Sequence, residues 1–248
     1  AYLGAFPIAE ALKSGADIVI TGRRVDSAVT LGACIYAFGW NEKEYDKLAA
    51  GSLAGHIIEC GTQSTGGNFT DWELVSKDLH QIGYPIVEVS EDGSFDCTKS
   101  KNSTGMVSFG TVAEQMLYEI GDPQAYILPD VICDFSNVKI EETEKDKVKI
   151  SGAKGYPAPN QYKVCATYAD GFRAGHVCSF VGIDAAKKAR TYGKAIFERS
   201  KMIMRMMNIA DFDETSIEII GDNSQYSKQS SNENNREVVL KFAAKHQD

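Results

Sequence analysis

A histidine and a glutamate lie three residues apart near the end of a helix predicted over residues 44–60. Spaced i, i+3, His56 and Glu59 project from neighbouring positions of that helix. Such a pair can transfer a proton or provide two metal ligands, but a metal site needs a third protein ligand and the sequence shows none beside them. We therefore predict His56 and Glu59 as catalytic residues and no metal site. The alternative is structural: His56 lies in the apolar stripe of the helix and Glu59 is its hydrogen-bond partner.

A second group of polar side chains follows the apolar run at residues 17–21. Arg23 can pair with a carboxylate or phosphate, and Asp26 can orient an arginine or act on a substrate proton. Ligands of open α/β sheets bind beyond the carboxyl ends of strands, where the next helix exposes unpaired N–H groups. We predict Arg23 and Ser27 as substrate-binding and Asp26 as catalytic. Equally, Asp26 or Ser27 is an N-cap and the arginines are surface charges.

An uncharged loop rich in glycine, serine and threonine follows the helix that carries His56. Its adjacent glycines would let backbone N–H groups approach an anion closely. The loop lacks the Walker lysine and the Gly-x-Gly-x-x-Gly spacing, so neither a P-loop nor a dinucleotide site is predicted. A plain helix-exit turn, with an aspartate capping the next short helix, is the alternative. The residues predicted to bind substrate here are Gln63, Thr65, Gly66, Gly67, Asn68 and Asp71.

The elements that must position these groups follow from periodicity and turn residues. Residues 6–14 predict a helix, residues 17–21 a central strand covered on both faces, and residues 27–38 a second helix, so that the last two form a βα unit. Residues 83–98 predict a hairpin around Glu91-Asp92-Gly93. The capping-box spacing from Thr111 to Glu114 predicts a helix that starts there and stops at residues 121–123.

The pattern changes at residue 130 to short, β-rich runs. We predict an α/β domain with a mainly parallel sheet and flanking helices over residues 1–129, part of a larger N-terminal domain. A β-rich α+β subdomain over residues 130–220 follows, with a helix at 184–207 and a strand at 215–220. Residues 221–248 are rich in Asn, Ser and Gln, and predict a polar linker or the start of a further segment.

Composition excludes several classes of protein. The 248 residues are 43% apolar and carry a formal charge of −8, without a basic block, so neither nucleic acid nor a membrane surface is an expected partner. No apolar run approaches the roughly 20 residues that span a bilayer. The six cysteines are spread widely, which is typical of reduced thiols. We predict a soluble intracellular protein, cytoplasmic or, in a eukaryote, mitochondrial.

The stretch GSLAGHIIECG at residues 51–61, continued by GGNFTDW at residues 66–72, closely resembles the acyclic terpene utilisation (AtuA) family. The resemblance extends through residue 183 and weakens afterwards. It implies a protein encoded near acyl-CoA carboxylases and linked to breakdown of acyclic terpenoids such as citronellol, or of branched acyl chains, but it implies no reaction type. The family's glycine-rich N-terminal segment is absent, so we expect this chain to be part of a longer protein. Arg24 also departs from the family, where an apolar residue is expected.

Our leading hypothesis is an enzyme of acyl-CoA, branched-chain acid or acyclic terpenoid catabolism. Its small-molecule substrate, with an acyl-CoA as one candidate, would bind between the turn at residues 23–27 and the helix exit at residues 56–71. Arg23 would bind an anionic group, Glu59 or His56 would move a proton, and residues 66–68 would donate backbone N–H groups.

The competing hypothesis is a noncatalytic scaffold or assembly subunit for an acyl-CoA carboxylase or hydratase, with the β-rich half and the Met-rich helix as its interface. A polar pocket shared by the turn and the helix exit would favour the enzyme. We also expect a homo-oligomer, and the sequence identifies no cofactor.

Overall fold

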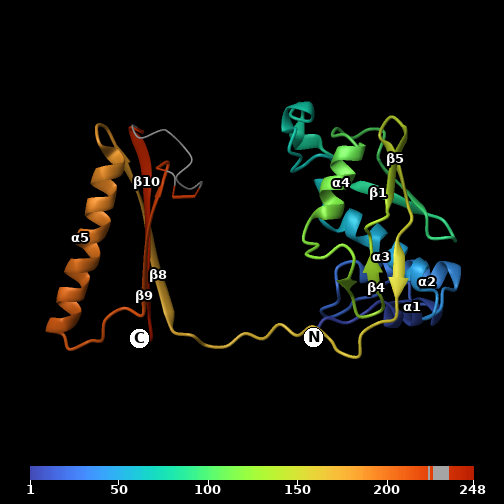
Figure 1. Cartoon of the computed structure of the whole chain (residues 1–248), viewed down its shortest axis with the longest axis horizontal. Coiled ribbons are helices and arrows are strands. Elements are labelled where there is room, and N and C mark those ends of the chain that lie inside the picture. The colour runs from blue at the N-terminus through green and yellow to red at the C-terminus, as the bar shows by residue number, and fades with distance from the viewer. Residues whose placement is uncertain (223, 226–234) are drawn as a thin grey trace. The chain divides into compact units, whose positions relative to one another are not determined.

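The computed structural model describes residues 1–222, 224–225 and 235–248, and it divides the chain into two compact units, Ala1–Cys165 and Ala166–Asp248 (Figure 1). The predicted boundary at residue 130 falls inside the first unit, and the one at residue 220 falls inside the second. Both units combine helices with sheets, which confirms the mixed α/β class.

The predicted parallel sheet is wrong, because every sheet in the described part of the chain is antiparallel. Parallel pairing occurs there only as two isolated bridges, Leu3–Arg24 and Ile82–Thr104. The predicted central strand at residues 17–21 does not form, and Ile18 and Ile20 are 82% and 92% exposed. An apolar run becomes a strand only where another segment completes its hydrogen-bond ladder. The predicted βα unit is therefore absent, although its helix forms.

The helices predicted over residues 6–14, 27–38 and 44–60 are confirmed. They are α1 (Phe6–Lys13), α2 (Ala28–Phe38) and α3 (Tyr45–Glu59). Every residue of α3 from 48 to 57 is buried, so α3 is the centre of the first unit. Three short 3₁₀ helices follow it: η1 (Gln63–Thr65), η2 (Trp72–Leu74) and η3 (Leu79–Gln81).

The helix predicted from Thr111 to residue 121 is α4 (Phe109–Leu117), displaced toward the N-terminus. Its capping box joins Ser108 and Thr111, and the Ser108 side chain accepts a hydrogen bond from the Thr111 N–H at 3.3 Å. Ser108 has the extended backbone that an N-cap requires, whereas Thr111 is already helical. Glu114 instead accepts a hydrogen bond from the Thr70 N–H at 3.1 Å.

Two small antiparallel sheets complete the first unit. The predicted hairpin is confirmed as β1 (Pro85–Val89) and β2 (Phe95–Lys99), with Val89 opposite Phe95 and Gly93 at a positive φ of 89° in the turn. The first sheet has the order β1-β2-β6-β5 and the second the order β3-β4-β7. Their other strands are β3 (Tyr126–Ile127), β4 (Ile132–Asp134), β5 (Lys139–Glu144), β6 (Lys147–Ser151) and β7 (Lys154–Tyr156).

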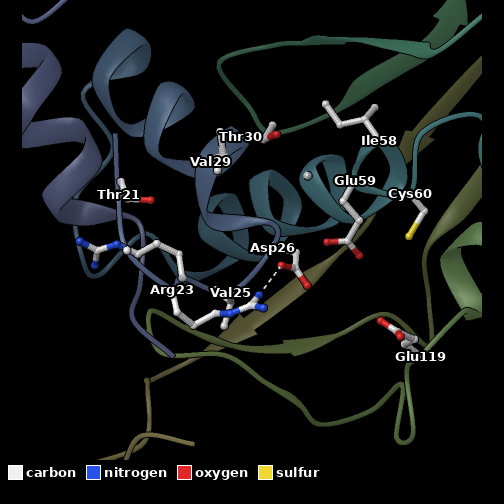
Figure 2. Close-up of a pocket in the computed structure, with 13 residues that line it drawn as sticks. Thr21, Arg23, Val25, Asp26, Val29, Thr30, Ile58, Glu59, Cys60 and Glu119 are labelled. Carbon is white, nitrogen blue, oxygen red and sulfur yellow. Dashed lines mark hydrogen bonds and ion pairs between the residues drawn. The ribbon is translucent and has the colours of Figure 1, made fainter. Parts of the chain in front are cut away.

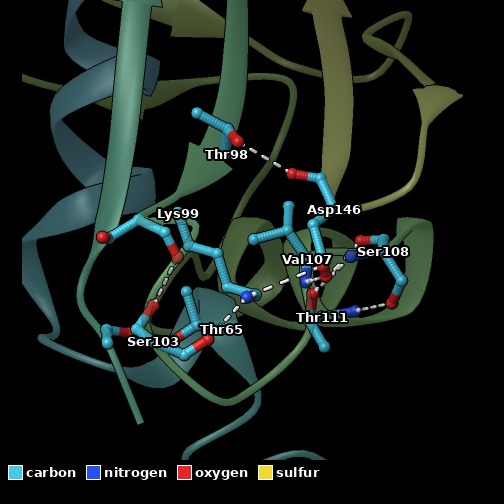
Figure 3. Close-up of polar contacts among 10 residues, drawn as sticks. Thr65, Thr98, Lys99, Ser103, Val107, Ser108, Thr111 and Asp146 are labelled. Carbon is cyan, nitrogen blue, oxygen red and sulfur yellow. Dashed lines mark hydrogen bonds and ion pairs between the residues drawn. The ribbon is translucent and has the colours of Figure 1, made fainter.

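Asp146, in the turn between β5 and β6, connects three segments through hydrogen bonds and an ion pair (Figure 3). Its carboxylate accepts a hydrogen bond from the Val107 N–H at 3.1 Å and lies 3.6 Å from Nζ of Lys99, whose side chain is only 8% exposed. The Thr98 hydroxyl donates to the Asp146 carbonyl oxygen at 2.9 Å. One aspartate thus joins the β5–β6 turn, the end of β2 and the segment that leads into α4.

The second unit has a three-stranded sheet of order β8-β10-β9 and one long helix, α5 (Ala185–Met206). Its strands are β8 (Phe172–Val181), β9 (Glu214–Ile220) and β10 (Glu237–His246). The predicted helix at 184–207 and strand at 215–220 are confirmed. The small residues Ala185, Ala189 and Gly193 are buried against the sheet, and Ile219 and Leu240 are fully buried with them.

The predicted polar linker over residues 221–248 lies partly outside the described residues, which omit 223 and 226–234. The part from Glu237 to His246 is not a linker, because β10 pairs with both β8 and β9. Among the described helices, none has the length and apolarity needed to cross a membrane.

Candidate functional site

A pocket of about 770 Å³ lies where the turn before α2 meets the last turn of α3 (Figure 2). Arg23 and Asp26 line it from the turn, Glu59 and Cys60 from the end of α3, and Glu119 from the segment after α4. Val25, Val29 and Ile58 provide apolar wall. The turn at residues 23–27 and the last turn of α3 therefore share one pocket, whereas residues 61–71 of the predicted helix exit do not line it.

The close approach of α2 and α3 builds this pocket. Gly55 lies against the backbone of Ser27, where a Cβ atom would stand 2.7 Å from the Ser27 Cα atom. Ser27 is the N-cap residue of α2, but its side chain makes no capping bond and is buried between the helices. Ser27 is therefore a packing residue, while Glu59, one turn beyond Gly55, reaches the pocket.

Arg23 and Asp26 form an ion pair at the mouth of the pocket. Arg23 Nη1 lies 3.2 Å from Asp26 Oδ1, and the two side chains are 61% and 60% exposed. The Arg23 guanidinium also stacks over the Tyr2 ring, 5.2 Å from its centroid. An exposed pair of this kind contributes only about 0–1 kcal/mol, so both side chains can exchange partners when a ligand binds.

Arg24 turns away from Asp26 toward the start of α1. Its Nη1 donates to the Gly4 carbonyl oxygen at 3.2 Å, and its Nε is buried without a partner among the described residues. Nearby, Asp130 accepts the Ala5 N–H at 2.8 Å. Burial raises the pKa of Asp130, against the lowering effects of the Ala5 hydrogen bond and the Arg24 charge. Arg24 thus holds the segment that leads into α1 and also lines the pocket.

His56 and Glu59 form the hydrogen bond that their spacing predicted. His56 Nδ1 lies 2.6 Å from Glu59 Oε1, and their side chains are 2% and 14% exposed. The Gln115 side-chain amide donates to the His56 carbonyl oxygen at 2.7 Å. His56 Nε2 is buried with no partner in the described part of the chain. Glu59 lines the pocket and His56 lies behind it, so Glu59 is the member of the pair that can meet a ligand.

Glu119 and Cys60 belong to the pocket but were not predicted to. Glu119 has a positive φ of 59°, uncommon for a residue other than glycine, and this turn aims its carboxylate at the pocket. Burial, and less strongly the charges of Glu59, Glu119 and Asp26, raise the pKa of Cys60, partly offset by a hydrogen bond with Gln115. The Cys60 thiol is therefore protonated near neutral pH and is a poor nucleophile.

The sequence model of the acyclic terpene utilisation family protein AtuA matches residues 1–248, which is the whole chain. The chain belongs to the AtuA family. The match includes the residues beyond 183, where the resemblance was weaker. No curated protein and no solved structure matches the chain.

In this AtuA family chain, the glycine-rich loop after α3 lies outside the pocket. The Gly66 N–H donates to the Gln63 carbonyl oxygen at 3.0 Å and the Gly67 N–H to that of Thr62 at 2.8 Å, so neither is free for an anion. The Thr65 hydroxyl donates to the Gly83 carbonyl oxygen at 2.6 Å. These bonds shape the turn itself.

The remaining predicted site residues also lie elsewhere. Asp71 is the N-cap residue of η2, without a side-chain capping bond, and lines a separate pocket of about 400 Å³ with Trp72. The structure therefore brings Arg23, Asp26 and Glu59 together, with His56 behind them. It leaves outside this pocket Gln63, Thr65, Gly66, Gly67, Asn68 and Asp71. No group of three or more His, Cys, Asp and Glu residues in the described part of the chain is arranged to hold a metal ion.

Proposed function

We propose that this AtuA family chain is an enzyme of acyl-CoA, branched-chain acid or acyclic terpenoid catabolism, with its active site in the pocket of Arg23, Asp26 and Glu59. One observation carries the proposal: a carboxylate that faces the pocket is hydrogen-bonded to a buried histidine. The family description names acyclic terpenes, which agrees with the apolar wall of Val25, Val29 and Ile58.

In this proposal Glu59 is the group that takes or gives a proton. Its Oε1 atom accepts the hydrogen bond from His56, and its Oε2 atom remains able to accept a proton from a ligand. His56 is a positioning residue, because its ring is buried and reaches the ligand only through Glu59. Arg23 and Asp26, at the mouth, would orient the polar end of the substrate.

A scaffold role has its own supporting observation in the second unit. The outer side of α5 exposes large apolar side chains, with Met202 44% and Met206 80% exposed, and β8 exposes Val177 and Val181. Exposed apolar residues of this kind suit an interface with another protein. A carboxylase or hydratase subunit, or a second copy of this chain in a homo-oligomer, would be the partner.

The intracellular location stays a prediction.

The test is thermal stabilisation by ligands, because specific binding to the native state raises its melting temperature. Wild-type protein is heated with acyl-CoAs, free branched acids, acyclic terpenoid alcohols and divalent metals. Val29→Trp fills the pocket from a 62% exposed position, and Val164→Trp, at a 65% exposed position, is the matched control. We expect one ligand class to stabilise wild type and Val164→Trp but not Val29→Trp.

Turnover separates the enzyme from a binding protein. With the stabilising ligand, Glu59→Gln should still bind but should lose product formation, followed by mass spectrometry, because the amide cannot accept the proton. If no ligand stabilises the protein and a carboxylase or hydratase co-purifies with it, the result would contradict the enzyme proposal and support the scaffold role.

A further inference from the structure

The strand β8 has a long free edge in the sheet of the second unit. In the order β8-β10-β9, it pairs with β10 and with no other described strand. Natural proteins protect such edges with charges, prolines, bulges or short strands, because the unpaired N–H and C=O groups of an edge bind other strands. β8 has ten residues without a proline, its described pairing with β10 has no register shift, and its only Lys, Arg, Asp or Glu residue is Arg173. This edge is therefore open to another strand.

The opposite edge of the same sheet, at β9, is protected. β9 is shorter, with seven residues, and includes Glu214 and Glu218. The helix above it adds an ion pair on that side, because the guanidinium of Arg190 in α5 lies 2.6 Å from the carboxylate of Asp222, just beyond β9. The contrast between the two edges indicates that β8 is the edge that pairs.

The β8 side of α5 is apolar and uncovered. α5 lies along one face of the sheet (Figure 1), and its Tyr192 ring packs against Phe180 of β8 with the ring centroids 5.6 Å apart. Ile196 and Ile203 follow Tyr192 by four and eleven residues, so they lie on the same side of the helix. All three side chains of α5 are exposed. A strand added beside β8 would extend the sheet beneath them.

We infer that two copies of this chain associate through β8, so that their three-stranded sheets join into one antiparallel sheet of six strands about a twofold axis. An axis perpendicular to the sheet keeps both α5 helices on the same face and brings their apolar sides together above the joint. A second copy is the occupant because a single surface of it supplies both missing parts. Its β8 pairs with the free edge, and its α5 covers Tyr192, Ile196 and Ile203.

The sequence of β8 suits an antiparallel pairing with itself that is centred on Val177. Residues equally far from Val177 then lie opposite each other, which places Arg173 opposite Val181 and His176 opposite Cys178. Like charges opposite each other destabilise a sheet, and in this register no two charged residues of the paired strands meet. On the face that α5 leaves open, the exposed Val177 side chains of the two copies contact each other.

The size of this surface matches that of a stable dimer. The ten residues of β8 and the 22 residues of α5 each extend about 33 Å, and the two layers together are about 20 Å deep. Association would therefore bury about 1,300 Å² over both copies, within the range of about 1,200–2,000 Å² for specific interfaces. The dimer involves only the second unit, so it stands whether or not the pocket of the first unit is an active site.

Disulfide formation in the whole chain tests the position of the axis. Val177→Cys is placed in a Cys165→Ser, Cys178→Ser background, which lacks the exposed thiol and the thiol of the same strand, and is oxidised with copper phenanthroline. Cα atoms directly opposite each other in an antiparallel pair are about 4.5–5.5 Å apart, a distance that a disulfide spans. Val181→Cys is the control, because its two copies would lie about 26 Å apart.

We expect a covalent dimer of Val177→Cys and little of Val181→Cys on a non-reducing gel, since the native side chains are 60% and 70% exposed and differ mainly in their distance from the axis. No cross-link at Val177→Cys, or equal cross-linking of the two variants, overturns the proposed pairing.

Sedimentation equilibrium measures the dimer without a cross-link. Val177→Lys places two lysines opposite each other and should weaken the dimer at least about tenfold. Ile203→Ser should weaken it several-fold, whereas Met202→Ser, on the outer side of α5, should not, although the two native side chains are 43% and 44% exposed. Circular dichroism shows whether each variant is folded.

Two results overturn the inference. One is a wild-type chain that stays monomeric at high micromolar concentration. The other is a dimer that Met202→Ser weakens as much as Ile203→Ser does, because this would place the interface on the outer side of α5 rather than beside β8.

Discussion

Gly55 and Ser27 are in backbone contact across α3 and α2: a Cβ atom at position 55 would lie 2.7 Å from the Ser27 carbonyl oxygen and 2.7 Å from its Cα atom. Real Cβ atoms do not approach other heavy atoms so closely, so any larger residue would push the helices apart. The pocket is built across this contact, since Asp26 precedes Ser27 and Glu59 follows Gly55 by one turn.

We therefore predict that Gly55→Ala destabilises the protein even though alanine favours helices. Overpacking at a buried backbone contact costs about 1–3 kcal/mol, which exceeds the roughly 1 kcal/mol of helix propensity gained. Urea unfolding followed by circular dichroism measures the change. Gly121→Ala is the control, because a Cβ atom there would meet no described atom within 4 Å and its φ is not positive. Equal stabilities of the two variants would show that the helices separate freely.

The hydrogen bond between His56 and Glu59 predicts an asymmetry between two substitutions. His56→Ala removes a ring that is 2% exposed, leaving a cavity and a half-buried carboxylate without its donor, and should cost about 2–4 kcal/mol. Glu59→Gln preserves the shape of the pair and keeps an oxygen acceptor, so it should cost less than about 1.5 kcal/mol. Chemical denaturation of both variants tests this order. Comparable losses would mean that the charge of Glu59 in its pairing with His56, rather than the shape of the hydrogen-bonded pair, carries the stabilisation.

Local patterns in the sequence predicted the helices and the hairpin well. The burial of α3 follows from its continuous apolar and small residues, and the turn at Gly93 follows from the Glu-Asp-Gly signal. The prediction of a strand at residues 17–21 was wrong because strand pairing is not local. It depends on another segment of the chain and cannot be read from an apolar run.

The residues of the candidate site also divide into those that local sequence patterns predicted and those that depend on the fold. His56 and Glu59 were found because residues three apart on a helix necessarily meet. Glu119 lies sixty positions beyond Glu59 in the sequence, and only the left-handed turn after α4 brings its carboxylate to the pocket. The Gly66 and Gly67 N–H groups looked available for a ligand, but nearby carbonyl oxygens occupy them. Whether a turn satisfies its own donors depends on backbone angles, which the sequence leaves open.

The network around Asp146 predicts a strong effect far from the pocket. Asp146→Ala removes the acceptor of the Val107 N–H and leaves Lys99, whose side chain is 8% exposed, without its carboxylate, so we expect a loss of about 2–4 kcal/mol. Asp146→Asn keeps an acceptor and tolerates the positive φ of 57°, and should lose less. A double-mutant cycle with Lys99→Met, measured by urea unfolding, should give a coupling of about 1 kcal/mol or more. Additive effects would mean that the two side chains do not interact.

The buried carboxyl of Asp130 predicts a pH dependence with a definite sign. Burial raises its pKa in the folded chain, whereas in the unfolded chain an aspartate titrates near about 3.9. The folded state therefore binds this proton more tightly, and the stability that Asp130 contributes is full below the unfolded pKa and is lost as the pH rises through the folded pKa. Asp130→Asn cannot ionise and keeps an oxygen for the Ala5 N–H.

The unfolding free energy of Asp130→Asn minus that of wild type should therefore increase with pH above about 3.9 and then level off once wild-type Asp130 is ionised. Urea unfolding of both proteins at a series of pH values gives this difference, and the titrations shared by both chains cancel. A difference that falls with rising pH would mean that the Ala5 N–H and Arg24 stabilise the ionised carboxylate by more than burial penalises it.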